Sequence, residues 1–465
     1  MKIAVVGTGY VGLVTAVCLA HWGHTVACVE TDRKKLSALK AGRSPIFEQG
    51  VEELMHSCAE RLSYTDSCGE ACADAQAVFI CVGTPARDDG FANLKQVFTV
   101  AEEIAACACR DCVCVVKSTV PIGTNLKLDR LFFSRTKRGV SIEAAANPEF
   151  LSQGTAVRDF LSGPRVVIGV ESAHSGEILK RIYADYHGKI IMTDRQTAEM
   201  IKYASNNFLA LKISYINEIA NLCEIVGADV ETVARGMGAD SRIGDKFLRA
   251  GIGYGGSCFP KDTKALHWLA KHHDYEIKTV KAAIEVNENQ KIRLIQKAHR
   301  YYPSLEGLTV AVLGLTFKPG TDDLRDAPSI PNIAVLLQEG AKIRVWDPSG
   351  YERINAVYPG RLACCGTIEE AVGGAHLCLI LTEWRQIREF DPAGYERLMK
   401  RPVVIDGRNC YSRDAAQKAG IAYDCIGRPR ILPRSWTDQA GRVLSLPVHS
   451  RKTASASVMS LQTSV

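Results

Sequence analysis

The chain has 465 residues, which is too long for one ordinary hydrophobic core and predicts two or three domains. Its formal charge of +6 is modest and gives no indication of nucleic-acid binding. No apolar run approaches the roughly 18 residues that a membrane span needs, and the N-terminus enters a strand rather than a signal peptide. We therefore expect a cytoplasmic protein.

Short apolar runs alternate with helical patterns over the first 120 or so residues. Strands are expected at 3–6, 25–29, 77–82 and 113–116, and further runs near 141–145, 166–170 and 189–192 extend the series. Alternation of strands and helices predicts a doubly wound parallel sheet. After residue 195 the pattern changes to long helices, about 197–226 and then 267–298, which predict an all-helical block.

A second alternating unit begins near residue 308. Strands are expected at 309–313, 342–346, 377–381 and 403–405, with a helix at 330–338. The expected fold is therefore α/β, with two Rossmann-like, doubly wound domains joined by a central helical block. The expected bounds are 1–195 for the first domain, 196–300 for the helices, 306–430 for the second domain and 431–465 for a disordered tail rich in Ser, Thr and Arg.

The 17 cysteines raise the question of a metal or redox site, above all in segment 107–114, which holds Cys107, Cys109, Cys112 and Cys114. The last two begin an apolar, strand-like run in which small thiols are commonly buried. No histidine lies nearby, and an odd number of cysteines in a reducing compartment argues against a disulfide framework. We interpret this segment as core and expect no metal.

A glycine motif, Gly7-Thr8-Gly9-Tyr10-Val11-Gly12, follows the first strand and opens the first helix. A second strand ends at Glu30, at the distance where an acid binds the ribose 2′-hydroxyl of a dinucleotide. A pyrophosphate would lie on the helix N-terminus. Glu30 favours NAD over NADP because a carboxylate repels a 2′-phosphate, although the cluster Arg33-Lys34-Lys35 lies close enough to weaken this preference.

A second motif, Gly253-Tyr254-Gly255-Gly256-Ser257-Cys258-Phe259-Pro260-Lys261-Asp262, places one cysteine at the end of a glycine-rich loop, just before a cation and a carboxylate. Beside a nicotinamide, a thiolate can add to an aldehyde and form a thiohemiacetal that expels a second hydride. The pairing of the two motifs predicts oxidation of an alcohol to an acid.

Several other polar residues are ambiguous from spacing alone. Lys202 and Asn206 project from one face of a helix, which fits a site or a solvated stripe. Thr119, Glu149 and Asp262 could each be a cap, a turn residue or a surface charge.

Six ordered motifs resemble the UDP-glucose/GDP-mannose dehydrogenase family over residues 1 to about 430. They are segment 117–124 (KSTVPIGT), segment 147–151 (NPEFL), segment 198–206 (AEMIKYASN), segment 247–251 (FLRAG), segment 255–262 (GGSCFPKD) and segment 317–319 (FKP). The resemblance implies NAD-dependent, four-electron oxidation of UDP-glucose to UDP-glucuronate. The alternatives are another nucleotide sugar such as GDP-mannose, or a two-electron hydroxyacid dehydrogenase, which needs neither Cys258 nor a second Rossmann-like domain.

The resemblance also implies roles, position by position. The catalytic residues would be a nucleophile (Cys258), a pair holding the reacting oxygen (Lys202 and Asn206), a pair positioning water (Thr119 and Asp262) and an acid/base residue for the aldehyde and thioester steps (Glu149). The cofactor contacts would be Gly7, Gly9, Tyr10, Val11, Gly12, Glu30, Lys35, Thr84, Thr119, Gln153, Lys261 and Arg325. The substrate contacts would be Glu149, Phe150, Leu151, Ser152, Lys202, Asn206, Arg242, Phe247, Leu248, Arg249, Ala250, Gly251, Gly255, Phe317 and Lys318.

Three details refine these expectations. Gln153 stands where the family usually has glutamate, so its cofactor contact would carry no charge. Arg242 resembles an arginine that reaches the substrate of a neighbouring subunit, which implies a homodimer through the helical block. A nucleophilic thiolate needs a lowered pKa, which we expect a nearby cation such as Lys202 to supply.

Overall fold

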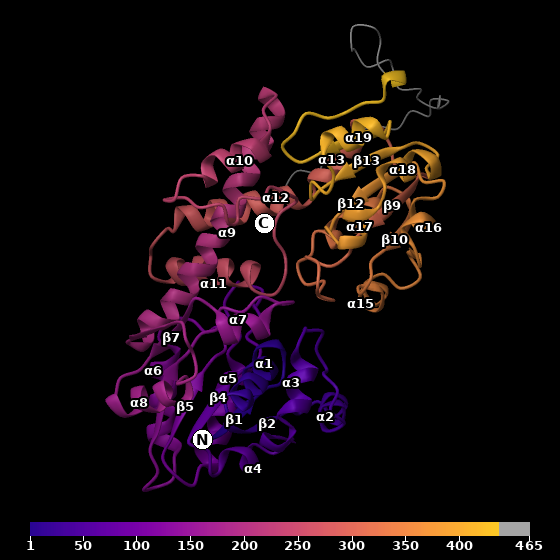
Figure 1. Ribbon diagram of the computed structural model, residues 1–465. Coiled ribbons are helices and arrows are strands. Elements are labelled where there is room, and N and C mark those ends of the chain that lie inside the picture. Colours follow the sequence, from indigo (N-terminus) through magenta and orange to yellow (C-terminus); the bar gives the residue numbers. More distant parts are fainter. Residues whose placement is uncertain (437–465) are drawn as a thin grey trace, which may run out of the picture.

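The N-terminal domain is built on an eight-stranded sheet in the order β3-β2-β1-β4-β5-β6-β7-β8. The computed structural model describes residues 1–436, and Figure 1 shows this domain at the indigo end of the molecule. Strands β4 and β5 are buried along their whole length because helices cover both faces of the sheet. The strands are β1 (Lys2–Val6), β2 (Thr25–Val29), β3 (Leu62–Thr65), β4 (Ala77–Ile80), β5 (Cys112–Val116), β6 (Ile142–Ala146), β7 (Arg165–Gly169) and β8 (Lys189–Thr193).

The sheet is mixed rather than fully parallel, which corrects the prediction for its last two strands. Strands β1 to β6 are parallel, whereas β6 and β7 pair antiparallel through Ala146 and Gly169, and β8 follows β7. Between β6 and β7 lies only the short helix α7 (Ala156–Ser162), which packs against α1 (Tyr10–His21) and does not form a crossover that would return the chain to a parallel strand.

The helices of this domain connect the strands. Helix α1 is apolar on almost every side and is buried, as the run between the glycine motif and Gly23 predicts. The helices are α1 (Tyr10–His21), α2 (Arg33–Lys40), α3 (Val51–Ser57), η1 (Ala59–Arg61), α4 (Cys68–Cys72), α5 (Lys95–Cys107), α6 (Thr124–Arg135), α7 and α8 (Ala173–Ile182).

A block of helices joins the two α/β domains. Its longest member, α9 (Arg195–Val226), is capped by the Asp194 side chain and ends at Gly227, which adopts the left-handed conformation common at helix ends. Helices α11 (Phe259–His272) and α12 (Lys278–Lys291) pack along α9 (Figure 1), and α10 (Val230–Gly238) and α13 (Arg293–Ala298) complete the block.

The C-terminal domain has a six-stranded, fully parallel sheet in the order β11-β10-β9-β12-β13-β14. Its strands are β9 (Thr309–Leu313), β10 (Lys342–Trp346), β11 (Ala363–Cys364), β12 (Leu377–Ile380), β13 (Val403–Asp406) and β14 (Ala422–Cys425). Its helices are α14 (Ser329–Gln338), α15 (Tyr351–Val357), α16 (Ile368–Val372), α17 (Arg385–Glu389), α18 (Pro392–Leu398), α19 (Arg413–Lys418) and η2 (Arg434–Trp436). In both sheets the strand order reverses beside the first strand, and ligands of such folds bind at the carboxyl ends of strands there.

The chain continues to pack beyond residue 430, so the expected start of the tail is wrong. Ile431 is buried and exchanges two backbone hydrogen bonds with Tyr423, at 2.9 and 2.8 Å. The guanidinium of Arg401 lies 4.5 Å from the ring centre of Trp436. The rest of the expected tail, residues 437–465, lies outside the described residues.

The cysteines of segment 107–114 divide into two groups. Cys112 and Cys114 are buried in β5, as expected. Cys107, at the end of α5, is half-buried and packs against the same core, whereas Cys109 is exposed, so the interpretation as core is wrong for Cys109. Among residues 1–436, no helix is long and apolar enough to cross a membrane.

Candidate active site

The glycine motif forms a tight turn between β1 and α1. Gly7 has a φ of +95°, and a Cβ at Gly12 would overlap the carbonyl oxygen of Gly7. A Cβ at Gly9, by contrast, would meet no protein atom within 4 Å. The backbone at the N-terminus of α1 is therefore open to a ligand, which suits a dinucleotide pyrophosphate.

Glu30 follows β2 at the same edge of the sheet. Its carboxylate is buried and accepts hydrogen bonds from Thr8 Oγ1 at 2.5 Å and from the Asp32 backbone N–H at 2.8 Å. These contacts fix a negative charge beside the glycine motif. Lys35, in the first turn of α2, is exposed.

Two segments that follow β4 and β5 meet at the switch in strand order. Thr84 Oγ1 donates to the Thr119 carbonyl at 2.8 Å, and Ser118 Oγ donates to the Val82 carbonyl at 2.6 Å. Thr119 also lines a small cavity together with Lys202. The expected cofactor and catalytic residues of these loops thus lie on one edge of the N-terminal sheet, which faces the helical block.

Cys258 stands at the N-terminus of α11, with Pro260 in the first turn of the helix. The glycine loop before it packs closely against the C-terminal domain. A Cβ at Gly256 would lie only 2.8 Å from the ring of Phe317. The Gly256 backbone N–H donates to the Arg325 carbonyl at 2.7 Å. Both contacts hold the Cys258 loop against the second domain.

Lys202 and Glu149 form a buried ion pair beside Cys258. Lys202 Nζ lies 2.8 Å from Glu149 Oε1, and the Leu151 backbone N–H donates to Glu149 Oε2 at 2.6 Å. Burial alone would raise the pKa of Glu149, but Lys202 and this backbone donor outweigh burial and hold the pKa below its usual range. Glu149 is therefore a carboxylate at neutral pH, and the pKa of Lys202 is raised because Glu149, Cys258 and Asp262 outweigh its burial.

Asn206 and Asp262 form a second polar pair in the site. Asn206 Nδ2 donates to Asp262 Oδ2 at 2.6 Å, and Lys261 Nζ lies 2.5 Å from Asp262 Oδ1. Asp262 is almost fully buried. Lys202 and Asn206 thus both lie beside the segment that carries Cys258 and Asp262. The alternative of a solvated stripe is wrong because both side chains are buried.

The pKa of the Cys258 thiol is raised, which corrects the expectation that a cation would lower it. Solvent reaches the thiol, but the surrounding walls desolvate it, and burial is the largest cause of the rise. The Glu149 charge adds to the rise, whereas Lys202 opposes it. Lys202 cannot dominate because the adjacent Glu149 carboxylate cancels most of its field.

The expected substrate contacts gather around the same loop. The ring centres of Phe247 and Phe259 lie 6.3 Å apart, and Phe247 has a φ of 64°, a left-handed conformation that is rare for a bulky residue. The Gly251 backbone N–H donates to Asn217 Oδ1 at 2.8 Å, which holds segment 247–251 against α9. From the second domain, Lys318 Nζ donates to Ser152 Oγ at 2.9 Å.

Two of the expected cofactor residues, Gln153 and Arg325, both contact Asp323 at the boundary between the domains. Gln153 Nε2 donates to Asp323 Oδ2 at 3.2 Å, and Thr321 Oγ1 donates to Gln153 Oε1 at 3.0 Å. Arg325 Nη2 lies 2.6 Å from Asp323 Oδ2. A glutamate at position 153 would face the Asp323 carboxylate, so the neutral amide matches this neighbour.

One expected substrate residue lies apart from the others. The Arg242 side chain is 87% exposed and pairs with Asp240 in its own loop. Within a single chain it does not join the residues around Cys258.

The structure also adds residues that the sequence reasoning missed. Arg408 Nη1 donates to the Gly253 carbonyl at 3.2 Å, and its Nη2 donates to the Phe317 carbonyl at 3.4 Å, which ties the Cys258 loop to the second domain. Asn287 accepts from the Tyr254 backbone N–H at 2.8 Å. Each contact joins segments far apart in the chain, and a single Arg or Asn in a helical or strand pattern gives no sequence signal for it.

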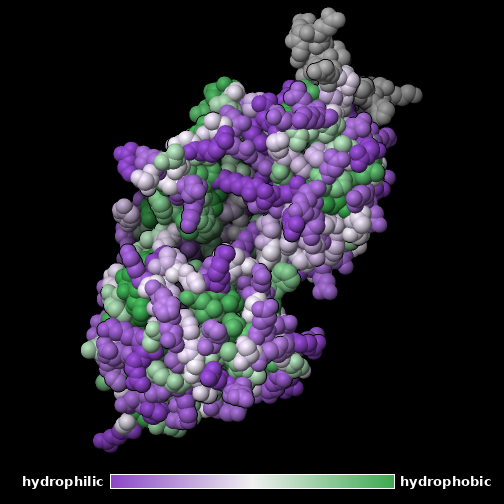
Figure 2. All heavy atoms as spheres, viewed as in Figure 1, coloured by the Kyte–Doolittle hydropathy of each residue, from purple (hydrophilic) through white to green (hydrophobic). Residues whose placement is uncertain are grey.

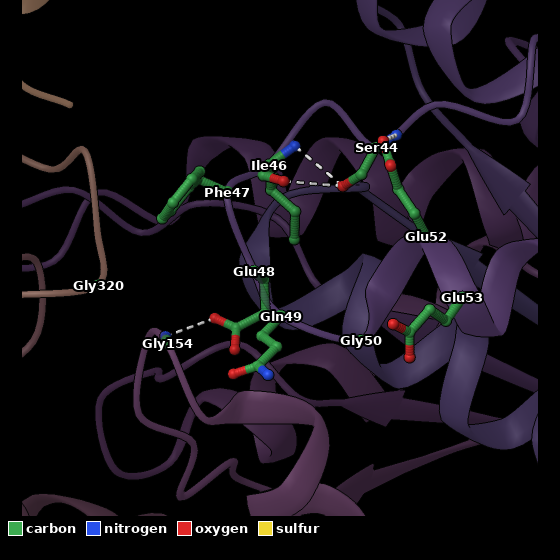
Figure 3. A pocket seen from close by; sticks show the side chains of 10 residues that line it. All are labelled: Ser44, Ile46, Phe47, Glu48, Gln49, Gly50, Glu52, Glu53, Gly154 and Gly320. Carbon is green, nitrogen blue, oxygen red and sulfur yellow. Dashed lines mark hydrogen bonds between the residues drawn. The ribbon is translucent and has the colours of Figure 1, made fainter. Parts of the chain in front are cut away.

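Glu48 is a further residue that the sequence reasoning missed. It accepts from the backbone N–H groups of Gly154 and Ala156, at 2.6 and 2.9 Å, and so fixes the loop that carries Ser152 and Gln153. Glu48 lines a cleft of about 660 Å³, together with other residues of segment 44–53 and Gly320 of the second domain. Figure 3 shows the Glu48 side chain pointing toward Gly154. Figure 2 shows that the surface is hollowed between the domains.

Comparison with known proteins accounts for nearly the whole described chain. Three models of the UDP-glucose/GDP-mannose dehydrogenase family match it: the NAD binding domain at 1–187, the central domain at 196–289 and the UDP binding domain at 311–413. The chain belongs to the UDP-glucose/GDP-mannose dehydrogenase family. The glycine motif therefore lies in the NAD-binding domain of the family, and Phe317 and Lys318 lie in its UDP-binding domain.

Individual relatives narrow the comparison. The chain is 47% identical over 435 residues to UDP-glucose 6-dehydrogenase YwqF of Bacillus subtilis, covering 93% of this chain and 99% of the relative. It is 45% identical to UDP-glucose 6-dehydrogenase of Rhizobium meliloti over 92% of this chain and 100% of the relative. A solved UDP-glucose dehydrogenase from Pyrobaculum islandicum superposes with a TM-score of 0.86 at 36% identity, covering 91% of this chain and 96% of that chain.

Proposed function

We propose that the chain is an NAD-dependent UDP-glucose 6-dehydrogenase that takes the sugar C6 alcohol to the carboxylate. The observation that carries the proposal is the convergence on Cys258 of Lys202, Glu149 and Asp262, between an NAD-binding and a UDP-binding domain. The balanced reaction consumes UDP-glucose, water and two NAD⁺ and releases UDP-glucuronate, two NADH and three protons.

The first oxidation uses the Glu149–Lys202 pair. Bound NAD supplies the chemistry of accepting a hydride from carbon. The Glu149 carboxylate is unprotonated at neutral pH and takes the proton of the C6 hydroxyl, directly or through water. Lys202 and Asn206 place two N–H donors where negative charge develops on the reacting oxygen.

The second oxidation uses Cys258. Its sulfur adds to the aldehyde carbon and forms a thiohemiacetal. This carbon then loses its hydride, for which the second NAD⁺ would be the acceptor, and the hydroxyl loses its proton, which gives a thioester. Water then adds to the thioester carbonyl and the Cys258 thiolate leaves. Because the pKa of Cys258 is raised, a base must remove its proton as the sulfur attacks, and Glu149 and Asp262 are the carboxylates whose charges act on it.

Substrate choice tests the proposal directly. We expect kcat/KM for UDP-glucose to exceed that for GDP-mannose by at least about tenfold, or about 1.4 kcal/mol of transition-state binding, because relatives that are 47% and 45% identical over nearly their whole length are UDP-glucose 6-dehydrogenases. The assay supplies purified protein with NAD and a panel of nucleotide sugars and follows NADH and product mass. A reversed preference would assign the chain to the GDP-mannose branch instead.

Cofactor choice rests on Glu30. NAD should be preferred to NADP, and Glu30→Ala should narrow the difference because it removes the carboxylate that repels a 2′-phosphate. Glu30→Ala also removes the acceptor for the Thr8 hydroxyl and the Asp32 backbone N–H. Glu30→Gln removes the charge but keeps the size of the side chain, so it is the matched control for the loss of these contacts. Equal kcat/KM for the two cofactors in the unmutated protein would contradict this assignment.

We further propose that two copies pair through α9. Phe208, Tyr215 and Leu222 recur every seven residues, so they share one face, and they are 61%, 48% and 53% exposed. Ile225 and Val226 extend this apolar surface, at 79% and 66% exposed. Figure 2 shows hydrophobic residues on the surface of the helical block. Pairing there would carry the exposed Arg242 toward the site of the partner.

The dimer has its own test. Leu222→Glu should convert a dimer into a monomer of 50.7 kDa in sedimentation velocity, because a charge would be buried in an apolar contact. The matched control is Phe133→Glu, which changes a 95% exposed side chain on α6, outside the apolar surface of residues 208–226, and should leave the mass unchanged. An unmutated protein that sediments as a monomer would contradict the proposal.

We also propose that the protein works in a reducing compartment, the cytoplasm. All 17 cysteines are free, and the mechanism needs Cys258 as a thiol.

A further inference from the structure

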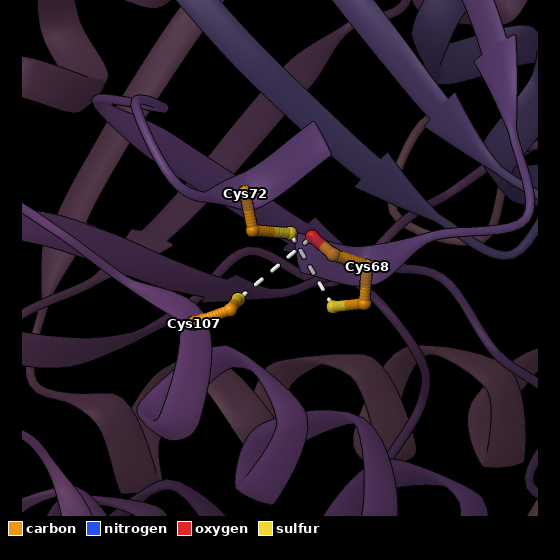
Figure 4. A group of neighbouring side chains, drawn as sticks. All are labelled: Cys68, Cys72 and Cys107. Carbon is orange, nitrogen blue, oxygen red and sulfur yellow. Dashed lines mark hydrogen bonds between the residues drawn. The ribbon is translucent and has the colours of Figure 1, made fainter. Parts of the chain in front are cut away.

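Three cysteines converge in the N-terminal domain, away from the nucleophile loop. Cys68 and Cys72 lie one turn apart on α4, and Cys107 is the last residue of α5. Their sulfur atoms all lie within 4.8 Å of one another, and those of Cys68 and Cys72 are 3.5 Å apart. Figure 4 shows the three side chains pointing toward a common point.

The spacing of the sulfurs matches that of a thiolate metal site. Sulfurs bound to one metal at about 2.3 Å in tetrahedral geometry lie roughly 3.8 Å apart, and in trigonal geometry roughly 4.0 Å. The 3.5 Å between the Cys68 and Cys72 sulfurs is close to these values, and the Cys107 sulfur lies within 4.8 Å of both. Among the described residues, this is the one group of three or more His, Cys, Asp or Glu side chains that meets the geometric requirement.

The three thiols differ in their access to solvent. Cys68 and Cys72 are buried, whereas Cys107 is half-buried and gives an ion access from solvent. Thiolate is the form of cysteine that binds metals.

We propose that Cys68, Cys72 and Cys107 bind a thiophilic metal ion, Zn²⁺ or Cu⁺, that joins α4 to α5. Three thiols lose their protons to solvent as three metal–sulfur bonds form, and no electron is transferred. Soft sulfur ligands select these two ions among the common metals. The prediction of no metal considered segment 107–114 alone, and Cys68 lies 39 residues before Cys107 in the chain.

The proposal does not depend on the dehydrogenase reaction. The ion would cross-link two helices that pack on the N-terminal sheet, so binding should stabilise this domain. The reaction site uses a different thiol, Cys258, on the helical block.

Metal titration of the reduced, metal-free, full-length protein tests the proposal, with Zn²⁺ in one arm and Cu⁺ in the other. We expect one ion per chain by native mass spectrometry in at least one arm, an ultraviolet sulfur-to-metal absorption band and a higher midpoint of thermal unfolding. Cys72→Ser and Cys107→Ser should each weaken binding at least tenfold. Because Cys72 is fully buried, Cys107→Ser is the variant more certain to fold.

Two matched variants separate the cluster from other thiols. Cys109→Ser changes an exposed cysteine in the same segment, and Cys258→Ser changes the nucleophile; both should bind the ion as the unmutated protein does. The proposal is overturned if no ion binds in either arm, if Cys107→Ser binds as tightly as the unmutated protein, or if Cys109→Ser or Cys258→Ser loses as much affinity. A disulfide within the cluster in place of a bound ion, seen as a mass loss of two hydrogens, would also overturn it.

Discussion

Replacing Cys258 by alanine should abolish conversion of UDP-glucose to UDP-glucuronate, by at least about a thousandfold, while leaving NAD binding unchanged. Without the sulfur no thiohemiacetal forms, so the second hydride has no donor. The glycine motif and Glu30 belong to a separate domain and keep their geometry. The measurements are product mass for the reaction and fluorescence titration for NAD.

Cys258→Ser separates nucleophilic chemistry from a merely structural role of this position. A serine hydroxyl is far less acidic than a thiol and would form an ester that hydrolyses slowly, so an adduct should accumulate and be detectable by intact mass. Cys109→Ser, at an exposed position outside the site, is the control and should retain full turnover. Full turnover of Cys258→Ala would rule out the covalent mechanism.

Replacing Lys202 by methionine should reduce both activity and stability. The change leaves the Glu149 carboxylate buried without its partner, which costs roughly 3–5 kcal/mol of folding free energy. It also removes an oxyanion donor, which should lower kcat by about 10²–10³. Urea unfolding and steady-state kinetics measure the two effects.

The double variant Lys202→Met/Glu149→Gln distinguishes the two roles. Removing both charges should restore most of the lost stability, because no uncompensated charge remains, whereas turnover should stay low. If the double variant were as unstable as Lys202→Met alone, the ion pair would not be the source of the instability.

The Glu149–Lys202 pair makes the stability of the folded protein depend on pH. The pKa of Glu149 is lower in the folded protein than its usual value, so its contribution to stability is present above the usual pKa of glutamate and is lost as pH falls through the folded-state pKa. The unmutated protein should therefore lose more stability on acidification than Glu149→Gln does. Parallel loss in both proteins would contradict the assignment.

The parts of the fold that the sequence predicts best are those with simple periodicity. Strands β9 and β10 and the long helix α9 were expected almost at their observed bounds, because buried parallel strands are nearly all apolar and a helix of this length shows its 3.6-residue pattern clearly. The direction of β7 was missed because periodicity does not encode whether the next strand is parallel.

Some features of the candidate site can likewise be predicted from the sequence, and others cannot. Gly12 and Cys258 stand in contiguous motifs, so their neighbourhood can be predicted. The raised pKa of Cys258 could not be predicted, because it depends first on how deeply the folded chain buries the thiol and then on Glu149, 109 residues earlier in the chain, which offsets the charge of Lys202. The contacts of Arg408 and Glu48 were not predicted for a related reason, because their partners are backbone groups of segments distant in the chain.

The measurement that tests the central claim most directly is the stoichiometry of a single substrate charge. A limiting amount of UDP-glucose, with excess NAD and trapping of free aldehyde, should yield two NADH per UDP-glucose and UDP-glucuronate as the product, with almost no trapped aldehyde. One NADH per UDP-glucose, with the aldehyde recovered in the trap, would contradict a four-electron oxidation through Cys258.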